Sequence, residues 1–178
     1  MRAPLWALTL VAAVALCVAC RAQGTTAPLV EDGYGGEYCQ PTAGTVRLTY
    51  GAGMPENTSD SPVRVTGVEL THAVGMELVG AKLMQVPAHG PGEAIGALGG
   101  WPPDFEGDRR LEADFDAAPP LDGAVIPPSR TEIPHFVVGI RATPGGHAGP
   151  VKVTYTSEGD EFTWTGRLTY RAAGAGGC

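Results

Sequence analysis

The chain has 178 residues and a formal net charge of −7, from 12 lysines and arginines against 19 aspartates and glutamates. This acidic balance argues against binding to nucleic acid or to an anionic lipid surface, since both need a basic patch. The length suits a single domain with one hydrophobic core.

The N-terminus has the pattern of a secretion signal. Met1 and Arg2 form a short positive region, and residues 3–19 are apolar apart from Thr9. Seventeen residues are at the lower limit for a membrane-spanning helix, and no charged stop-transfer flank follows them. We therefore expect residues 1–19 to be a signal peptide that is cleaved after Ala19.

Cys20 follows the expected cleavage bond directly. A cysteine at this position resembles the lipobox of bacterial lipoproteins, in which it is acylated before cleavage, although Cys17 stands where that motif has leucine. The resemblance implies an anchor in the outer face of the cell membrane. Ordinary secretion and an uncleaved anchor are the alternatives. Residues 20–43, rich in small and turn-forming residues, are expected to be a tether.

Alternating apolar residues begin at Gly44 and predict strands. Apolar residues occupy every second position in three runs: Val46, Leu48 and Tyr50; Phe136, Val138 and Ile140; and Val151, Val153 and Tyr155. In a fourth run, Phe162, Trp164, Leu168 and Tyr170 fall on one face. A further strand is expected between Met76 and Val86. Apolar parity changes between residues 63–65 and 68–70, which predicts a bulge at Thr66-Gly67. Turn residues 157–160 between two alternating runs predict a hairpin.

These elements predict the fold class. No sustained helical period occurs outside the signal, so we expect an all-β protein: an immunoglobulin-like β-sandwich of six or seven antiparallel strands over residues 44–172, followed by a flexible tail at 173–178. Residues 87–130 contain half of the prolines and are expected to form a long Pro/Gly-rich loop insertion. Trp101 within this loop is expected to be partly buried.

Several of these segments resemble a known group of bacterial proteins. The stretches 61–70, 76–81, 126–129, 136–140 and 151–155 are similar to an immunoglobulin-like module in uncharacterised lipoproteins of high-GC Gram-positive bacteria. The resemblance covers roughly residues 44–172. It implies a sandwich held outside the cytoplasm, and it implies no catalytic residue.

One group of residues has ligands suited to copper. His72, Met76, Met84 and His89 fall within 18 residues, and imidazole and thioether groups bind Cu(I). Met76 and Met84 share strand parity, which would place both on one face. Methionine is also a common core residue, and we favour core packing with surface histidines over a metal site.

Other chemistry is poorly supported by the residues. The alternating carboxylates at 104–116 have Arg109 and Phe115 where a calcium loop needs glycine and glutamate. No serine lies in a nucleophile elbow, and no histidine has a carboxylate at a suggestive spacing. We expect neither a catalytic residue nor a cofactor.

Two cysteines, Cys39 and Cys178, remain once Cys17 leaves with the signal and Cys20 takes the lipid. An exported protein lies in an oxidising compartment, so an intramolecular disulfide is expected. Two free thiols, or a Cys178 paired with another chain, are the alternatives.

The sequence thus predicts a non-catalytic, membrane-tethered extracytoplasmic lipoprotein that presents a sandwich module to another envelope protein. The Pro/Gly-rich loop at 87–130 is the expected contact surface, because a rigid sandwich often binds through a loop that it positions. A copper-binding carrier is the alternative function.

Overall fold

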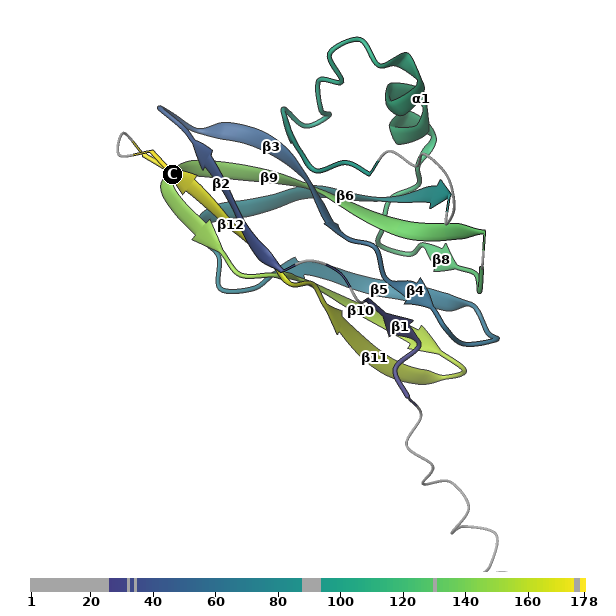
Figure 1. Cartoon of the computed structure of the whole chain (residues 1–178). Coiled ribbons are helices and arrows are strands. Elements are labelled where there is room, and N and C mark those ends of the chain that lie inside the picture. The colour runs from purple at the N-terminus through teal and green to yellow at the C-terminus, as the bar shows by residue number, and fades with distance from the viewer. Residues whose placement is uncertain (1–25, 32, 34, 88–93, 130, 175–176) are drawn as a thin grey trace, which may run out of the picture.

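The computed structural model describes residues 26–31, 33, 35–87, 94–129, 131–174 and 177–178 (Figure 1). The expected signal peptide, Cys20 and His89 lie outside these residues. Twelve strands and one helix are found in the described part of the chain. They are β1 Leu29–Val30, β2 Gly36–Pro41, β3 Val46–Gly53, β4 Glu56–Asn57, β5 Val63–Leu70, β6 Val74–Pro87, β7 Ala97–Gly99, α1 Arg109–Ala117, β8 Val125–Ile126, β9 Glu132–Ala148, β10 Val151–Ser157, β11 Asp160–Thr165 and β12 Leu168–Ala173.

The strands form two main sheets, which confirms the all-β sandwich. One sheet has the order β11-β10-β5-β8, and the other has the order β2-β12-β9-β3-β7 with β6 paired to β9. The described residues hold more strands than the six or seven expected, partly because several pairings involve only two or three residues. Strand β2 also runs parallel to β12, whereas all strands were expected to be antiparallel.

The alternating runs face the core between the sheets, as the sequence predicts. Tyr50, Val138, Val153 and Trp164 are all buried in one hydrophobic cluster. The bulge is also confirmed. Val65 of β5 pairs with Tyr155 and Gly67 pairs with Thr154, so Thr66 is one extra residue between two consecutive pairs. This restores a single buried face on β5.

The predicted hairpin is formed by β10 and β11. Its turn is tighter than the four residues expected, since Ser157 still pairs with Asp160. Glu158 and Gly159 have φ angles of 53° and 91°, and two positive values are what a two-residue type I′ turn requires.

The expected tether at 20–43 is wrong in its second half. Strand β1 pairs with β4, and β2 lies along β12 with Tyr38 opposite Tyr170. The ring of Tyr38 also stacks on Tyr50, with centroids 5.2 Å apart. These remote partners hold the segment on the sandwich, although its own sequence shows no alternation.

The expected loop at 87–130 is instead folded over most of its described length. Residues 94–126, which we call the cap, begin with β7 at the edge of the six-stranded sheet, carry α1 over the outer face of that sheet, and end with β8 at the edge of the four-stranded sheet (Figure 1). A second hydrophobic cluster joins Ile95 and Phe115 of the cap to Met84 and Val137 of the sheet. Trp101 is half-buried in this cluster, as expected.

Helix α1 was missed because its helical pattern is short. Asp108 caps its N-terminus by accepting hydrogen bonds from the backbone N–H groups of Arg110 and Leu111, both at 3.0 Å. Leu111 and Phe115 are its apolar pair at i, i+4, and only Phe115 is fully buried. Two large apolar side chains in nine residues give a weak periodic signal.

Two glycines shape the seat of the cap. Gly80 and Gly139 are paired across β6 and β9, and the Trp101 indole lies against both of them. A Cβ atom at Gly139 would stand 2.1 Å from Cδ2 of Trp101, and one at Gly80 would stand 2.6 Å from Cζ2. The close approach of the indole to the sheet therefore requires glycine at both positions.

Candidate functional site

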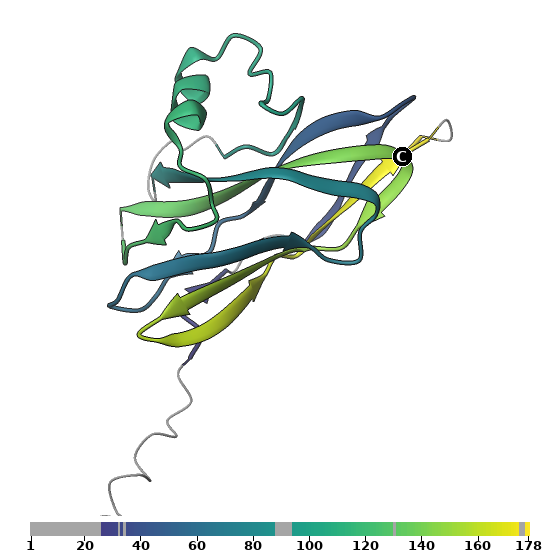
Figure 2. The same ribbon diagram turned by 180° about the vertical axis from the view of Figure 1, so that it is seen from behind.

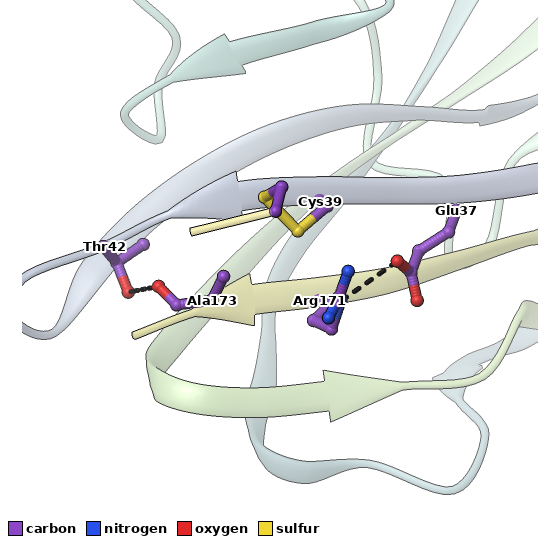
Figure 3. The surroundings of a disulfide bond; sticks show 6 residues. Glu37, Cys39, Thr42, Arg171 and Ala173 are labelled. Carbon is purple, nitrogen blue, oxygen red and sulfur yellow. Dashed lines mark hydrogen bonds and ion pairs between the residues drawn. A yellow bond between two sulfur atoms is a disulfide. The ribbon is translucent and has the colours of Figure 1, made fainter. Parts of the chain in front are cut away.

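The expected disulfide is present between Cys39 and Cys178, whose Cα atoms are 5.7 Å apart (Figure 3). Cys39 lies within β2, in the segment that was expected to be a tether, and stands opposite Arg171 of β12. The bridge therefore joins the C-terminus to β2, the strand that pairs with the last strand, β12. Arg171 also forms an ion pair with Glu37 at 3.0 Å, so the crosslink lies next to a charged contact between the same two strands.

The structure separates the two methionines of the predicted copper group. Met76 and Met84 are both buried, but Met76 lies in the core between the sheets and Met84 lies under the cap. Val79 is an extra residue between two paired positions of β6, so the parity of the strand changes between the two methionines. The prediction that they share a face is therefore wrong.

Of the two histidines of that group, the structure describes one. His72 is exposed in the turn between β5 and β6, with a φ of 48°. His89 lies outside the described residues. Within the described ranges, no three histidine, cysteine, aspartate or glutamate side chains are close enough to hold a metal ion.

His135 was not singled out by the sequence, yet it is the one histidine in the core of the described structure. It is 2% exposed and stands across from Met84 on the outer face of the sheet. Burial lowers its pKa from 6.5 to about 4, and a hydrogen bond to the Ile95 carbonyl opposes this only in part. Its Nδ1 atom has no hydrogen-bond partner. His135 is therefore a neutral imidazole beneath the cap.

Three tyrosines from different strands form an aromatic cluster. The rings of Tyr50 and Tyr170 are 4.9 Å apart, and Tyr38 stacks on both. Burial, with a smaller effect of Tyr38, raises the pKa of Tyr50 to about 12, and burial likewise raises the pKa of Tyr170. These hydroxyl groups stay protonated at neutral pH and lie in the core, so the cluster is structural.

Two hollows lie beside the cap. The first, of about 350 Å³, lies between α1 and the ends of β6 and β9. The second, of about 510 Å³, lies between β5, β6 and the cap, and we call it the β5–β6 groove. Its lining residues are Val68, Leu78, Val79, Gly80, Ala81, Lys82, Trp101, Pro120 and Asp122.

Two charged side chains line the β5–β6 groove: Lys82, which is hydrogen-bonded within the fold, and Asp122, which is exposed. The Lys82 ammonium donates to the carbonyl oxygens of Phe115 and Asp116 at the end of α1, at 2.6 and 3.3 Å, and lies 4.5 Å from the Phe115 ring centroid. Asp122 is exposed at the rim. The cap as a whole carries seven carboxylates and two arginines, so its surface is acidic.

Compared with protein-family models, with curated proteins and with solved structures, the chain gives no significant match. Within the described ranges, no helix is both long and apolar enough to cross a membrane.

Proposed function

We propose that this protein is a non-catalytic, membrane-tethered extracytoplasmic lipoprotein whose β-sandwich presents the cap as a binding surface to another envelope protein. One observation carries the binding role: the cap is folded against the sandwich and forms walls of both hollows described above. A loop held in one conformation by a rigid scaffold can bind without a large ordering cost.

The positions of the perturbed groups support binding over catalysis. In the described residues, burial shifts the pKa of His135 and of three tyrosines, Tyr50, Tyr155 and Tyr170. All four lie in the core and none lines either hollow. Shifted pKa values are common at catalytic sites, where the acid or base lies at a surface that substrate can reach.

The membrane anchor is supported by the sequence around Cys20 and is tested by labelling. The full chain, expressed in a bacterium, is expected to incorporate labelled palmitate and to partition into detergent, and Cys20→Ala is expected to abolish both. A soluble wild-type protein that starts at an unmodified cysteine would contradict the anchor.

The binding surface is tested by site-specific cross-linking in the same cells. A photo-reactive side chain in place of Asp122, at the end of the cap, is expected to give a discrete cross-linked partner. The same side chain in place of Asp160, an exposed residue of the β10–β11 hairpin, is the matched control. Equal cross-linking from both positions would show that the cap is not the contact surface.

A further inference from the structure

The side of the sandwich between β5 and β6 is closed over only part of its length. Residues 119–126 run from the edge of β6 to the edge of β5 (Figure 2). Leu83 N–H donates to the Pro119 carbonyl and Leu121 N–H to the Ala81 carbonyl, so this crossing segment pairs with β6. On β5, Val65 N–H donates to the Ala124 carbonyl, and β8 continues the pairing. The crossing segment therefore acts as an added strand on both edges.

Beyond the crossing segment, the two edges stay open among the described residues. No described strand pairs with the outer edge of β6 over residues 74–80. The same holds for the outer edge of β5 over residues 66–70. The β5–β6 groove lies here, and Val68 and Leu78 in it are only half-buried although both pack on the main core. Val74, at the start of β6, is 58% exposed. An open strand edge next to apolar side chains is the arrangement that binds extended peptides.

The charge around the groove indicates the chemistry of its occupant. The Lys82 ammonium is held by carbonyl groups of α1, whereas Asp122 is exposed at the rim below an acidic cap. A second copy of this chain would bring its own acidic cap and net negative charge to the same place. A peptide with basic side chains avoids that repulsion.

We propose that the β5–β6 groove binds an extended, basic peptide segment of the partner protein, which adds a strand to the open edge of β6. Apolar side chains at alternate positions of the segment cover Val68 and Leu78, and a lysine or arginine side chain meets Asp122. This inference rests on the proposed function as a binding module and names the partner chemistry. The pairing continues along β6 from the place where the crossing segment ends.

Two synthetic peptides test the proposal, with alternating valine and lysine in one and alternating valine and glutamate in the other. With the full chain in detergent, the lysine peptide is expected to bind and to slow backbone amide exchange over residues 74–80, as followed by mass spectrometry. The glutamate peptide is expected to bind several-fold more weakly. Protection elsewhere, or equal binding of the two peptides, would overturn the proposal.

Charge reversal at the rim sharpens the test. Asp122→Lys is expected to weaken the lysine peptide about two- to five-fold at low salt, the scale of one exposed ion pair, and to strengthen the glutamate peptide. Asp160→Lys is the matched control and is expected to leave both affinities unchanged. If both variants act alike, or if residues 74–80 become protected by self-association without peptide, the assigned occupant is wrong. No membrane is used, so this result is independent of palmitate labelling and cross-linking in cells.

Discussion

Burial of His135 is expected to make the fold lose stability as the pH falls below about 6.5. Its pKa is 6.5 when exposed and about 4 in the fold. Between these values the unfolded state binds more protons than the folded state, so the stability is present above the unfolded pKa and is lost toward pH 4. A shift of this size corresponds to about 3 kcal/mol, at 1.36 kcal/mol per pKa unit.

The assay is urea unfolding at intervals between pH 8 and pH 4. Carboxylates also titrate near the acidic end, but they are common to the wild-type protein and its variants and cancel in the difference. His135→Gln is expected to remove up to about 1.4 kcal/mol per pH unit from the slope, because that is the effect of one proton. Val138→Ala, at a buried residue of the same strand that carries no titratable group, is the matched control and is expected to lower the stability and to keep the wild-type slope.

Parallel curves for the wild-type protein and His135→Gln would refute the reasoning. They would mean that the pKa of His135 in the fold is close to that in the unfolded chain. Burial beneath the cap would then cost the charged imidazole little free energy. A lower stability of His135→Gln at every pH is a separate effect, since the variant loses the hydrogen bond to Ile95. Only the slope tests the pKa.

Two further changes have expected outcomes. Cys178→Ser opens a ring closed over 139 residues of separation, and the free energy of unfolding in denaturant is expected to fall by up to about 5 kcal/mol; an unchanged midpoint would contradict a stabilising bridge. Gly139→Ala places a methyl group inside the Trp101 indole and is expected to lift the cap, with a red shift of tryptophan emission. Gly99→Ala is the control, because the added Cβ atom has no neighbour within 4 Å. Equal spectra for both variants would refute the close contact between Trp101 and Gly139.

Local patterns were enough to predict much of the sandwich. Val46, Leu48 and Tyr50 face the core because alternation along a strand is a property of the backbone itself. The bulge beside Gly67 was readable because the apolar parity changes within one short run. The disulfide was predictable by counting cysteines, although the strand that holds Cys39 was not.

The cap and its hollows could not be predicted in the same way. Residues 94–126 show no strand or helix period of useful length, and their order comes from contacts with the sheet, such as Phe115 on Val137 and Trp101 on Gly139. His135 lies at an outer-face position of β9, which would be exposed to solvent if the cap did not cover it. A remote segment decides its burial, so no pattern around His135 could have shown its low pKa.

The copper hypothesis shows the same division between local pattern and tertiary structure. Parity counted along the sequence places Met76 and Met84 on one face, and the single extra residue at Val79 reverses it. That bulge lies where the register between β6 and β9 shifts, and the indole of Trp101 lies against the next residue, Gly80. The sequence by itself determined the all-β character and most core faces. Only the tertiary structure decided that the outer face of the six-stranded sheet is buried beneath the cap, because this burial depends on segments far apart in the chain.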